Sequence, residues 1–168
     1  AYDSNDPEWE QKLKNVTDSL IDQIDNLAAI ASEFSDFAKM PVSKPEVIDL
    51  EEVLSNTKDL YSNFENVSIY FQNNTENSYV KADYKQLTRV FNNILDNAVK
   101  AIPKEQKGQI QIKIEQKEAL LVVSISDNGR GIPKEMRENI FSPSFTTKSS
   151  GMGLGLTMVK NIVNNSGG

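Results

Sequence analysis

Two prolines, Pro41 and Pro45, separate two parts of the sequence whose apolar residues follow different periods. Before Pro41, apolar residues recur every three or four positions, the spacing that lines up along one side of an α-helix. After Pro45, helical spacing is interspersed with one-by-one alternation, as in strands with one buried face. The sequence therefore predicts a long helix, a linker over residues 42–45 and a mixed domain over residues 46–168.

The long helix is predicted over residues 9–39, within an N-terminal part that comprises residues 1–41. Asp6 followed by Pro7 is typical of a helix start, and Pro41 ends the helix because proline lacks an amide hydrogen. A helix with one apolar stripe needs a partner to cover it. We expect the stripe to be the seam of a coiled coil or bundle, with packing on the chain's own domain as the alternative. The stripe residues are Leu13, Val16, Leu20, Ile24, Leu27, Ala31, Phe34 and Ala38.

The second part is predicted to be an α+β domain. Its predicted helices run from residue 51 to about 64, from 83 to 102 and from 154 to 164. Alternating apolar residues predict strands at 47–50, 67–71, 79–82, 110–114 and 121–125. The second and third of these strands are expected to pair, and the last two to form an antiparallel hairpin.

The composition excludes several classes of site. There is no cysteine and no histidine, so neither a disulfide, a thiolate metal site nor a histidine-based catalytic triad is possible. Lysine and arginine total 18 against 24 acidic residues, which argues against nucleic acid as a partner because that requires basic surface. No apolar run approaches the roughly 18 residues of a membrane span, and the missing cysteines favour the cytoplasm.

The first polar segment that packing does not explain is residues 93–100. Asn93, Asn97 and Lys100 are spaced four and three residues apart, so they share one side of the predicted helix. Two carboxamides and an ammonium group suit phosphate oxygens and a hydrated cation, and Mg²⁺ needs few protein ligands beside phosphates and water. A solvated polar helix face is the alternative explanation.

The second segment, Asp-Asn-Gly-Arg-Gly-Ile-Pro at residues 127–133, directly follows a predicted strand. The carboxylate of Asp127 suits an exocyclic amine such as that of adenine. Gly129 and Gly131 would let a ligand approach the backbone closely. A simple tight turn is the alternative.

The third segment, Gly-Met-Gly-Leu-Gly-Leu at residues 151–156, lies at the start of the last predicted helix. Backbone amides at a helix N-terminus suit phosphate groups, and glycines permit close contact. No Gly-Lys-Ser/Thr follows, so the segment is not a P-loop. Leu156 occupies the position of the last glycine in a dinucleotide-binding fingerprint, so that motif is excluded as well.

In this order, the three segments resemble the N, G1 and G2 boxes of the GHKL ATP-binding superfamily. Between the second and third, residues 141–148 (Phe-Ser-Pro-Ser-Phe-Thr-Thr-Lys) resemble the F box of sensor histidine kinases. The resemblance covers about residues 46–168. Upstream, residues 24–41 are similar to the second dimerisation helix of nitrogen-regulation (NtrY-like) kinases.

The resemblance implies a Bergerat-type ATP-binding fold: a two-layer α/β sandwich with helices on one face of a mixed sheet, preceded by a long dimerisation-type helix. ATP and Mg²⁺ would bind between the helix layer and a mobile lid.

The same resemblance gives each box a role. Asn97 would coordinate Mg²⁺, and Asn93 and Lys100 would be catalytic residues near the phosphates. Asp127 would accept a hydrogen bond from the adenine amine. The other nucleotide-binding positions would be Gly129, Gly131 and Ile132 at the base, Phe145, Thr146, Thr147 and Lys148 in the lid beside the anchor Phe141, and Gly151, Gly153, Leu154, Gly155 and Leu156 in the G2 box.

Members of the superfamily that hydrolyse ATP carry a glutamate four residues before the metal-binding asparagine. That position is Asn93 here, and a carboxamide cannot act as a general base. Asp96 adjoins Asn97 in sequence but lies about 100° away around a helix. The resemblance therefore implies a protein histidine kinase, in which ATP is held for phosphoryl transfer to another group.

Kinases of this type phosphorylate a histidine on their first dimerisation helix. A chain without histidine cannot be its own acceptor, so it should not autophosphorylate. We expect the acceptor helix to precede the present helix in the parent protein, and a final strand hairpin to follow Gly168. The resemblance implies a homodimer through the dimerisation helices, a response regulator receiver domain as partner, and a parent that is cytoplasmic or anchored in the inner membrane.

Two alternatives remain open. A nucleotide-binding pseudokinase would use the same boxes as a scaffold without phosphoryl transfer. A dimeric coiled-coil protein would account for residues 9–39 but for nothing after Pro41.

Overall fold

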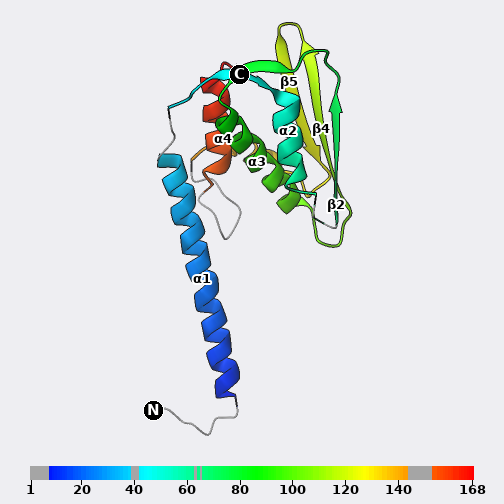
Figure 1. Cartoon of the computed structure of the whole chain (residues 1–168). Coiled ribbons are helices and arrows are strands. Elements are labelled where there is room, and N and C mark those ends of the chain that lie inside the picture. Colours follow the sequence, from blue (N-terminus) through cyan, green and yellow to red (C-terminus); the bar gives the residue numbers. More distant parts are fainter. Residues whose placement is uncertain (1–7, 39–41, 63, 65, 144–152) are drawn as a thin grey trace.

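The computed structural model describes residues 8–38, 42–62, 64, 66–143 and 153–168. Helix α1 (Trp9–Ala38) is a single helix of 30 residues that extends away from the rest of the molecule (Figure 1). The predicted long helix is therefore confirmed. Its apolar stripe is largely exposed, with Leu20 at 57%, so packing on the chain's own domain does not cover it. Among the described helices, none is both long and apolar enough to cross a membrane.

A small antiparallel sheet pairs β1 (Glu46–Asp49) with β3 (Tyr79–Ala82). The prediction that residues 79–82 pair with residues 67–71 is therefore wrong. Alternation identifies the buried face of a strand but not its neighbour. Here the loop before β3 carries it across to β1, where the Leu50 amide donates to the Ser78 carbonyl at 3.0 Å.

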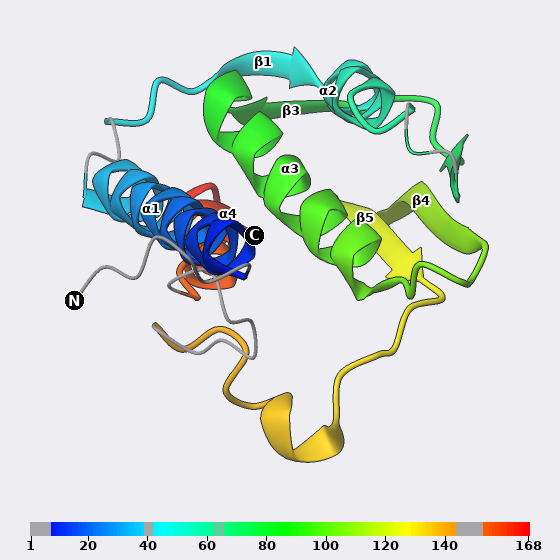
Figure 2. The same ribbon diagram turned by 90° about the horizontal axis from the view of Figure 1, so that it is seen from below.

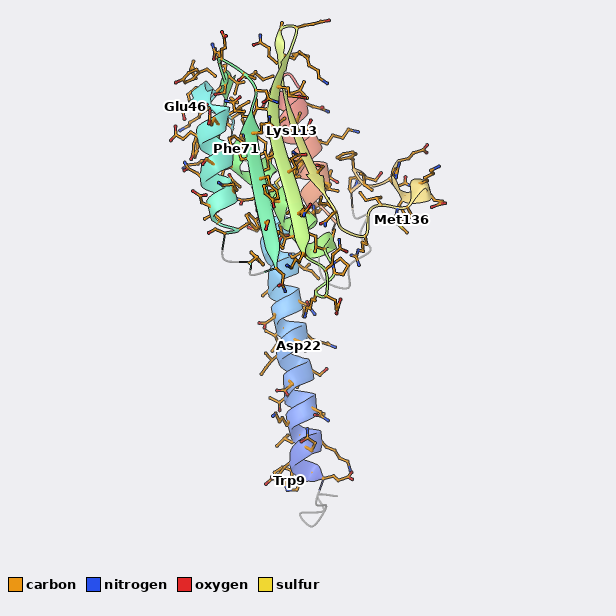
Figure 3. All side chains as sticks on the ribbon, turned by 90° about the vertical axis from the view of Figure 1, so that its right-hand side faces the viewer. Trp9, Asp22, Glu46, Phe71, Lys113 and Met136 are labelled. Atoms are coloured by element: carbon orange, nitrogen blue, oxygen red, sulfur yellow. The ribbon has the colours of Figure 1, made fainter. Side chains whose placement is uncertain are left out.

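The main sheet has the strand order β2-β4-β5, formed by β2 (Val67–Asn73), β4 (Gly108–Lys117) and β5 (Leu120–Asp127). β2 runs parallel to β4, while β4 and β5 form the predicted antiparallel hairpin. The central position of β4 explains its burial: Ile110, Ile112 and Ile114 are completely inaccessible to solvent. Figure 3 shows this sheet with Phe71 on β2 and Lys113 on β4.

Three helices form the second layer: α2 (Leu50–Asp59), α3 (Tyr84–Ala101) and α4 (Gly155–Asn165). They cover one face of the strands, and the segment carrying the short helix η1 (Lys134–Met136) runs away from the sheet before the chain returns at α4 (Figure 2). Leu54, Leu95 and Ile162 meet the β4 isoleucines in one core. This arrangement confirms the predicted two-layer α/β sandwich.

Helix α2 ends at Asp59 rather than near residue 64. The amides of Leu60, Tyr61 and Ser62 each donate to a carbonyl three residues back, so the chain tightens into turns. The Ser62 hydroxyl also donates to the Asp59 carbonyl at 2.7 Å. Such a side-chain bond competes with continuation of the helix.

The carboxylate of Asp83 joins the linker to the start of α3. One oxygen accepts the Gln86 amide at 3.0 Å and caps the helix, while the other accepts the Lys44 amide at 2.8 Å. Pro45 has no amide hydrogen to continue the β1–β3 ladder, so the side chain provides the next connection. Chiefly because it accepts the Lys44 amide, the pKa of Asp83 lies below its usual value.

Candidate nucleotide-binding site

The N-box residues lie on the C-terminal half of α3. The Asn93 carboxamide donates to the Arg89 carbonyl at 2.8 Å, and Lys100 forms an ion pair with Asp96 at 2.8 Å. Asn97 lies between them along the helix and is half-buried. The sequence spacing therefore places the two carboxamides and the ammonium group along one helix, as predicted.

The G1 box begins at the last residue of β5. The exposed Asp127 carboxylate accepts the Gly129 amide at 2.9 Å, which orients it at the strand end. A Cβ on Gly129 would lie 2.7 Å from the Ala101 carbonyl oxygen. The close approach that this glycine permits is thus to the end of α3, where the Arg130 amide also donates to Ala101 at 3.0 Å.

Gly131 serves a different purpose. Its φ of 69° lies in the left-handed region, and nothing lies within 4 Å of the position of an added Cβ. Glycine is favoured there by backbone conformation rather than by crowding. The adjoining Ile132 is exposed, and its carbonyl accepts the Arg137 side chain at 3.1 Å.

The G2 box meets the N box at the start of α4. Gly155 begins the helix, and a Cβ there would lie 2.6 Å from the Asn93 Oδ1 atom. Gly153 has a φ of 67°, and Leu154 is buried. Of the described G2 residues Gly153, Leu154, Gly155 and Leu156, Gly155 lies directly against the helix that carries Asn93 and Asn97.

The described part of the F box is anchored on α4. The Thr157 hydroxyl donates to the Phe141 carbonyl at 3.1 Å, and the Lys160 ammonium lies 5.9 Å from the centre of the Phe141 ring. The predicted lid residues Phe145, Thr146, Thr147 and Lys148, together with Gly151, lie outside the described residues.

Asn128 was not identified from the sequence, where the G1 box drew attention to its aspartate and glycines. Its Oδ1 accepts the Gln109 amide at 2.8 Å, and its Nδ2 donates to the Lys107 carbonyl at 3.0 Å. Lys107 lies at the end of the connection between α3 and β4, and Gln109 is the second residue of β4. An asparagine at a strand end is a residue type that often bonds to nearby backbone, but the sequence does not show which backbone groups Asn128 contacts.

The electrostatics of α3 extend beyond the boxes. Tyr61 of the turn after α2 donates to the Asn92 carbonyl at 3.1 Å. Burial, and then the negative charge of Asp96, raise the pKa of this phenol. Asp96 therefore acts on Tyr61 through its charge and is itself ion-paired with Lys100.

A metal ion at this site would depend on phosphate oxygens. Among the described residues, no group of three or more acidic, histidine or cysteine side chains is placed to hold a metal. A single carboxamide oxygen such as that of Asn97 fits Mg²⁺, which retains waters and binds together with substrate phosphates.

Comparison with known proteins gives a consistent result. Residues 82–168 match the family described as histidine kinase-, DNA gyrase B-, and HSP90-like ATPase. The chain is 34% identical over 149 residues to the sensor histidine kinase ZraS of Escherichia coli O157:H7, covering 87% of this chain and 32% of ZraS. It is 30% identical over 162 residues to a putative NtrY-like sensor histidine kinase of Rickettsia conorii, covering 94% of this chain and 27% of that protein.

Solved structures agree. The catalytic domain of histidine kinase ThkA superposes with a TM-score of 0.66 at 31% identity, covering 73% of this chain and 82% of that domain. ThkA in complex with the response regulator TrrA gives a TM-score of 0.72 at 28% identity, covering 98% of this chain and 47% of ThkA.

The present chain spans about a third or less of the length of its curated relatives. The matched family segment comprises β5 with the G1 box, α3 with the N box and α4 with the G2 box. The chain therefore belongs to the histidine kinase-, DNA gyrase B- and HSP90-like ATPase family, as an ATP-binding catalytic domain of the sensor histidine kinase type.

Proposed function

We propose that this chain binds ATP together with Mg²⁺ and donates the γ-phosphoryl group to a histidine on a dimerisation helix outside its 168 residues. The observation that carries the proposal is that both glycine boxes pack on the N-box helix. Gly129 lies against Ala101, and Gly155 lies against Asn93. Segments separated in sequence thus meet along α3, which supports a shared site there.

Each residue has a role in this proposal. Asp127 accepts a hydrogen bond from the adenine amine. Asn97 holds Mg²⁺, which neutralises phosphate charge when bound. Asn93 and Lys100 contact the phosphates. The G2 segment and the lid cover them, with backbone amides at the start of α4 suited to anionic oxygens.

Phosphoryl transfer is favoured over hydrolysis because, within the described residues, the position four before Asn97 carries no carboxylate that could act as a general base. Asn93 is a carboxamide whose nitrogen donates to Arg89, and Asp96 is paired with Lys100.

The proposal extends to partners and domain organisation. We assign residues 1–41 to the second dimerisation helix, residues 42–45 to a linker and residues 46–168 to the catalytic domain. The exposed stripe on α1 would pair with the same helix of a second subunit. A response regulator receiver domain would accept the phosphoryl group, as the solved complex of ThkA with TrrA suggests by analogy. We propose that this domain lies in the cytoplasm, in a parent protein that is itself cytoplasmic or anchored in the inner membrane.

The test is calorimetric titration with a non-hydrolysable ATP analogue, with and without Mg²⁺. Metal-assisted binding that is weakened at least tenfold in Asp127→Asn is expected, because the base loses its charged acceptor. A folded chain that binds no nucleotide would exclude the proposal. Phosphorylation of a separately supplied acceptor helix then distinguishes a kinase from a pseudokinase scaffold.

A further inference from the structure

We propose that Asn128 is a positioning residue for adenine recognition, because it fixes the G1 loop on the α3–β4 connection and so sets where the Asp127 carboxylate lies. The inference rests on the proposed function, in which Asp127 is the adenine acceptor. It assigns a role to a side chain that does not itself contact the nucleotide.

Four hydrogen bonds hold Asn128 to the end of the α3–β4 connection and to the start of β4. The Gln109 amide donates to its Oδ1 at 2.8 Å, and its Nδ2 donates to the Lys107 carbonyl at 3.0 Å. Its amide donates to the Gln109 carbonyl at 3.2 Å, and its carbonyl accepts the Gln106 side chain at 2.7 Å. A carboxamide is suited to this position because it combines an acceptor with a donor.

The clamp acts where regular structure ends. The β4–β5 ladder closes with Ile110 opposite Asp127, and beyond it the Asn128 amide keeps one backbone bond to Gln109 of β4. Asn128 holds the loop from the β4 side, while Gly129 and Arg130 hold it from the α3 side through Ala101. Asp127 lies at the start of this doubly held turn.

The two anchors connect the base end of the site to its phosphate end. α3 carries Asn97 and ends at Ala101, against which the loop packs. A loop held on both sides keeps Asp127 at a constant distance from the N box. If the β4-side anchor is removed, the carboxylate should sample positions that discriminate adenine less well.

The experiment compares binding of adenosine, ADP, ATP and GTP to the parent chain and to Asn128→Ala. We expect affinities for adenosine, ADP and ATP to fall by a similar factor of about ten, as the loss of two side-chain hydrogen bonds suggests. The preference for ATP over GTP should fall as well, since guanine presents a carbonyl where adenine presents an amine. The dependence on Mg²⁺ should persist, because the phosphate end is unchanged.

Two further variants grade the effect. Asn128→Asp keeps the acceptor for Gln109 but loses donation to Lys107, so it should bind with intermediate affinity. Gln106→Ala removes one bond to the Asn128 backbone and should give a smaller loss of the same pattern. Asn164→Ala, at an exposed position near the end of α4, is the matched control and should leave binding unchanged.

The outcomes separate the inference from the proposed function. A parent chain that binds no adenine ligand overturns both. A parent that binds ATP, with Asn128→Ala equal in affinity and in ATP-over-GTP preference, overturns the inference alone. A lower melting temperature with unchanged base preference also overturns it, because Asn128 would then support only the fold.

Discussion

Helices α1 and α3 carry similar apolar stripes but have opposite surroundings. On α3 the stripe is buried, with Leu95 at 0% exposure, whereas on α1 Leu20 is 57% exposed. Both helices carry their apolar residues on one side and their polar residues on the other. The difference teaches that an amphipathic pattern indicates a face that needs covering but not what covers it.

The largest expected difference between the two helices is in the stability cost of shortening one stripe residue on each. Leu95→Ala should lower the free energy of unfolding by about 2–5 kcal/mol, because it leaves a cavity between α3 and the sheet. Leu20→Ala should change it by less than about 0.5 kcal/mol at low concentration. Urea unfolding measures both.

The dependence of stability on chain concentration tests the Leu20→Ala variant further. If α1 pairs with a second copy, the cost of Leu20→Ala should grow as the chain concentration rises, because association stabilises the folded state. Sedimentation of parent and variant is the direct check. A chain that remains monomeric at all concentrations would contradict the proposed α1 pairing. A Leu95→Ala variant with an unchanged free energy of unfolding would contradict the assigned core.

The next effect concerns the C-terminal end of α3, which another segment covers. Gly129→Ala should destabilise the fold by about 1–3 kcal/mol, because the new Cβ would lie 2.7 Å from a backbone oxygen that cannot move aside. ATP affinity should fall with it. Thermal unfolding and nucleotide titration give the two values.

Gly131→Asn is the control for this glycine. Asparagine tolerates the left-handed conformation at that position, and the surrounding space is open. Its effect should be distinctly smaller. Equal losses for the two variants would contradict the role assigned to the close contact between Gly129 and α3.

At the N-terminal end of α3, Asp83→Ala should cost about 0.5–2 kcal/mol through loss of the helix cap. Asp83→Ser keeps a capping oxygen but is too short to reach Lys44 as well, so it should recover most of the stability. Amide hydrogen exchange at Lys44 should still accelerate in Asp83→Ser. Unchanged exchange at Lys44 in that variant would mean that the carboxylate does not hold the linker.

The lowered pKa of Asp83 also predicts a pH dependence. A depressed carboxyl pKa contributes stability above the unfolded-state value near 3.9, and the contribution is lost as pH falls through the folded-state value. Asp83→Asn should therefore show a smaller loss of stability on acidification than the parent. Lys85 contributes to the shift, so Lys85→Ala should reduce it slightly.

The smallest effect compares surface ion pairs on the two helices. Asp96→Asn on α3 and Glu8→Gln beside α1 each remove one exposed pair, worth about 0.2–1 kcal/mol at most. Only Asp96→Asn should alter ATP affinity, raising it about twofold by releasing Lys100 toward the phosphates. No difference in affinity between the two variants would remove Lys100 from the proposed phosphate contacts.

Much of the fold could be predicted because hydrophobic period is a local property. Helix α3, the β4–β5 hairpin and α4 all follow from the spacing of apolar residues. The partner of β3 did not follow, since alternation in residues 79–82 is satisfied equally by β1 or β2. The end of α2 was missed because it depends on hydrogen bonds of Ser62 and its neighbours rather than on period.

The candidate site divides in the same way. Asn97, Asp127 and the G2 glycines stand out by residue type and order. Asn128 does not, because its partners Gln109 and Lys107 lie 19 and 21 residues away in sequence. The sequence likewise predicts a ligand near Gly129 but gives no sign of its close contact with Ala101.

By itself, the sequence determined which faces are apolar, where the chain must turn and which residue types are available for nucleotide chemistry. Only the tertiary structure decided that the two glycine boxes meet on α3, that Asn128 holds the G1 loop and that the α1 stripe stays uncovered by the domain. The physical reason is that period and composition are local, whereas a hydrogen bond or a close contact requires two distant segments to meet.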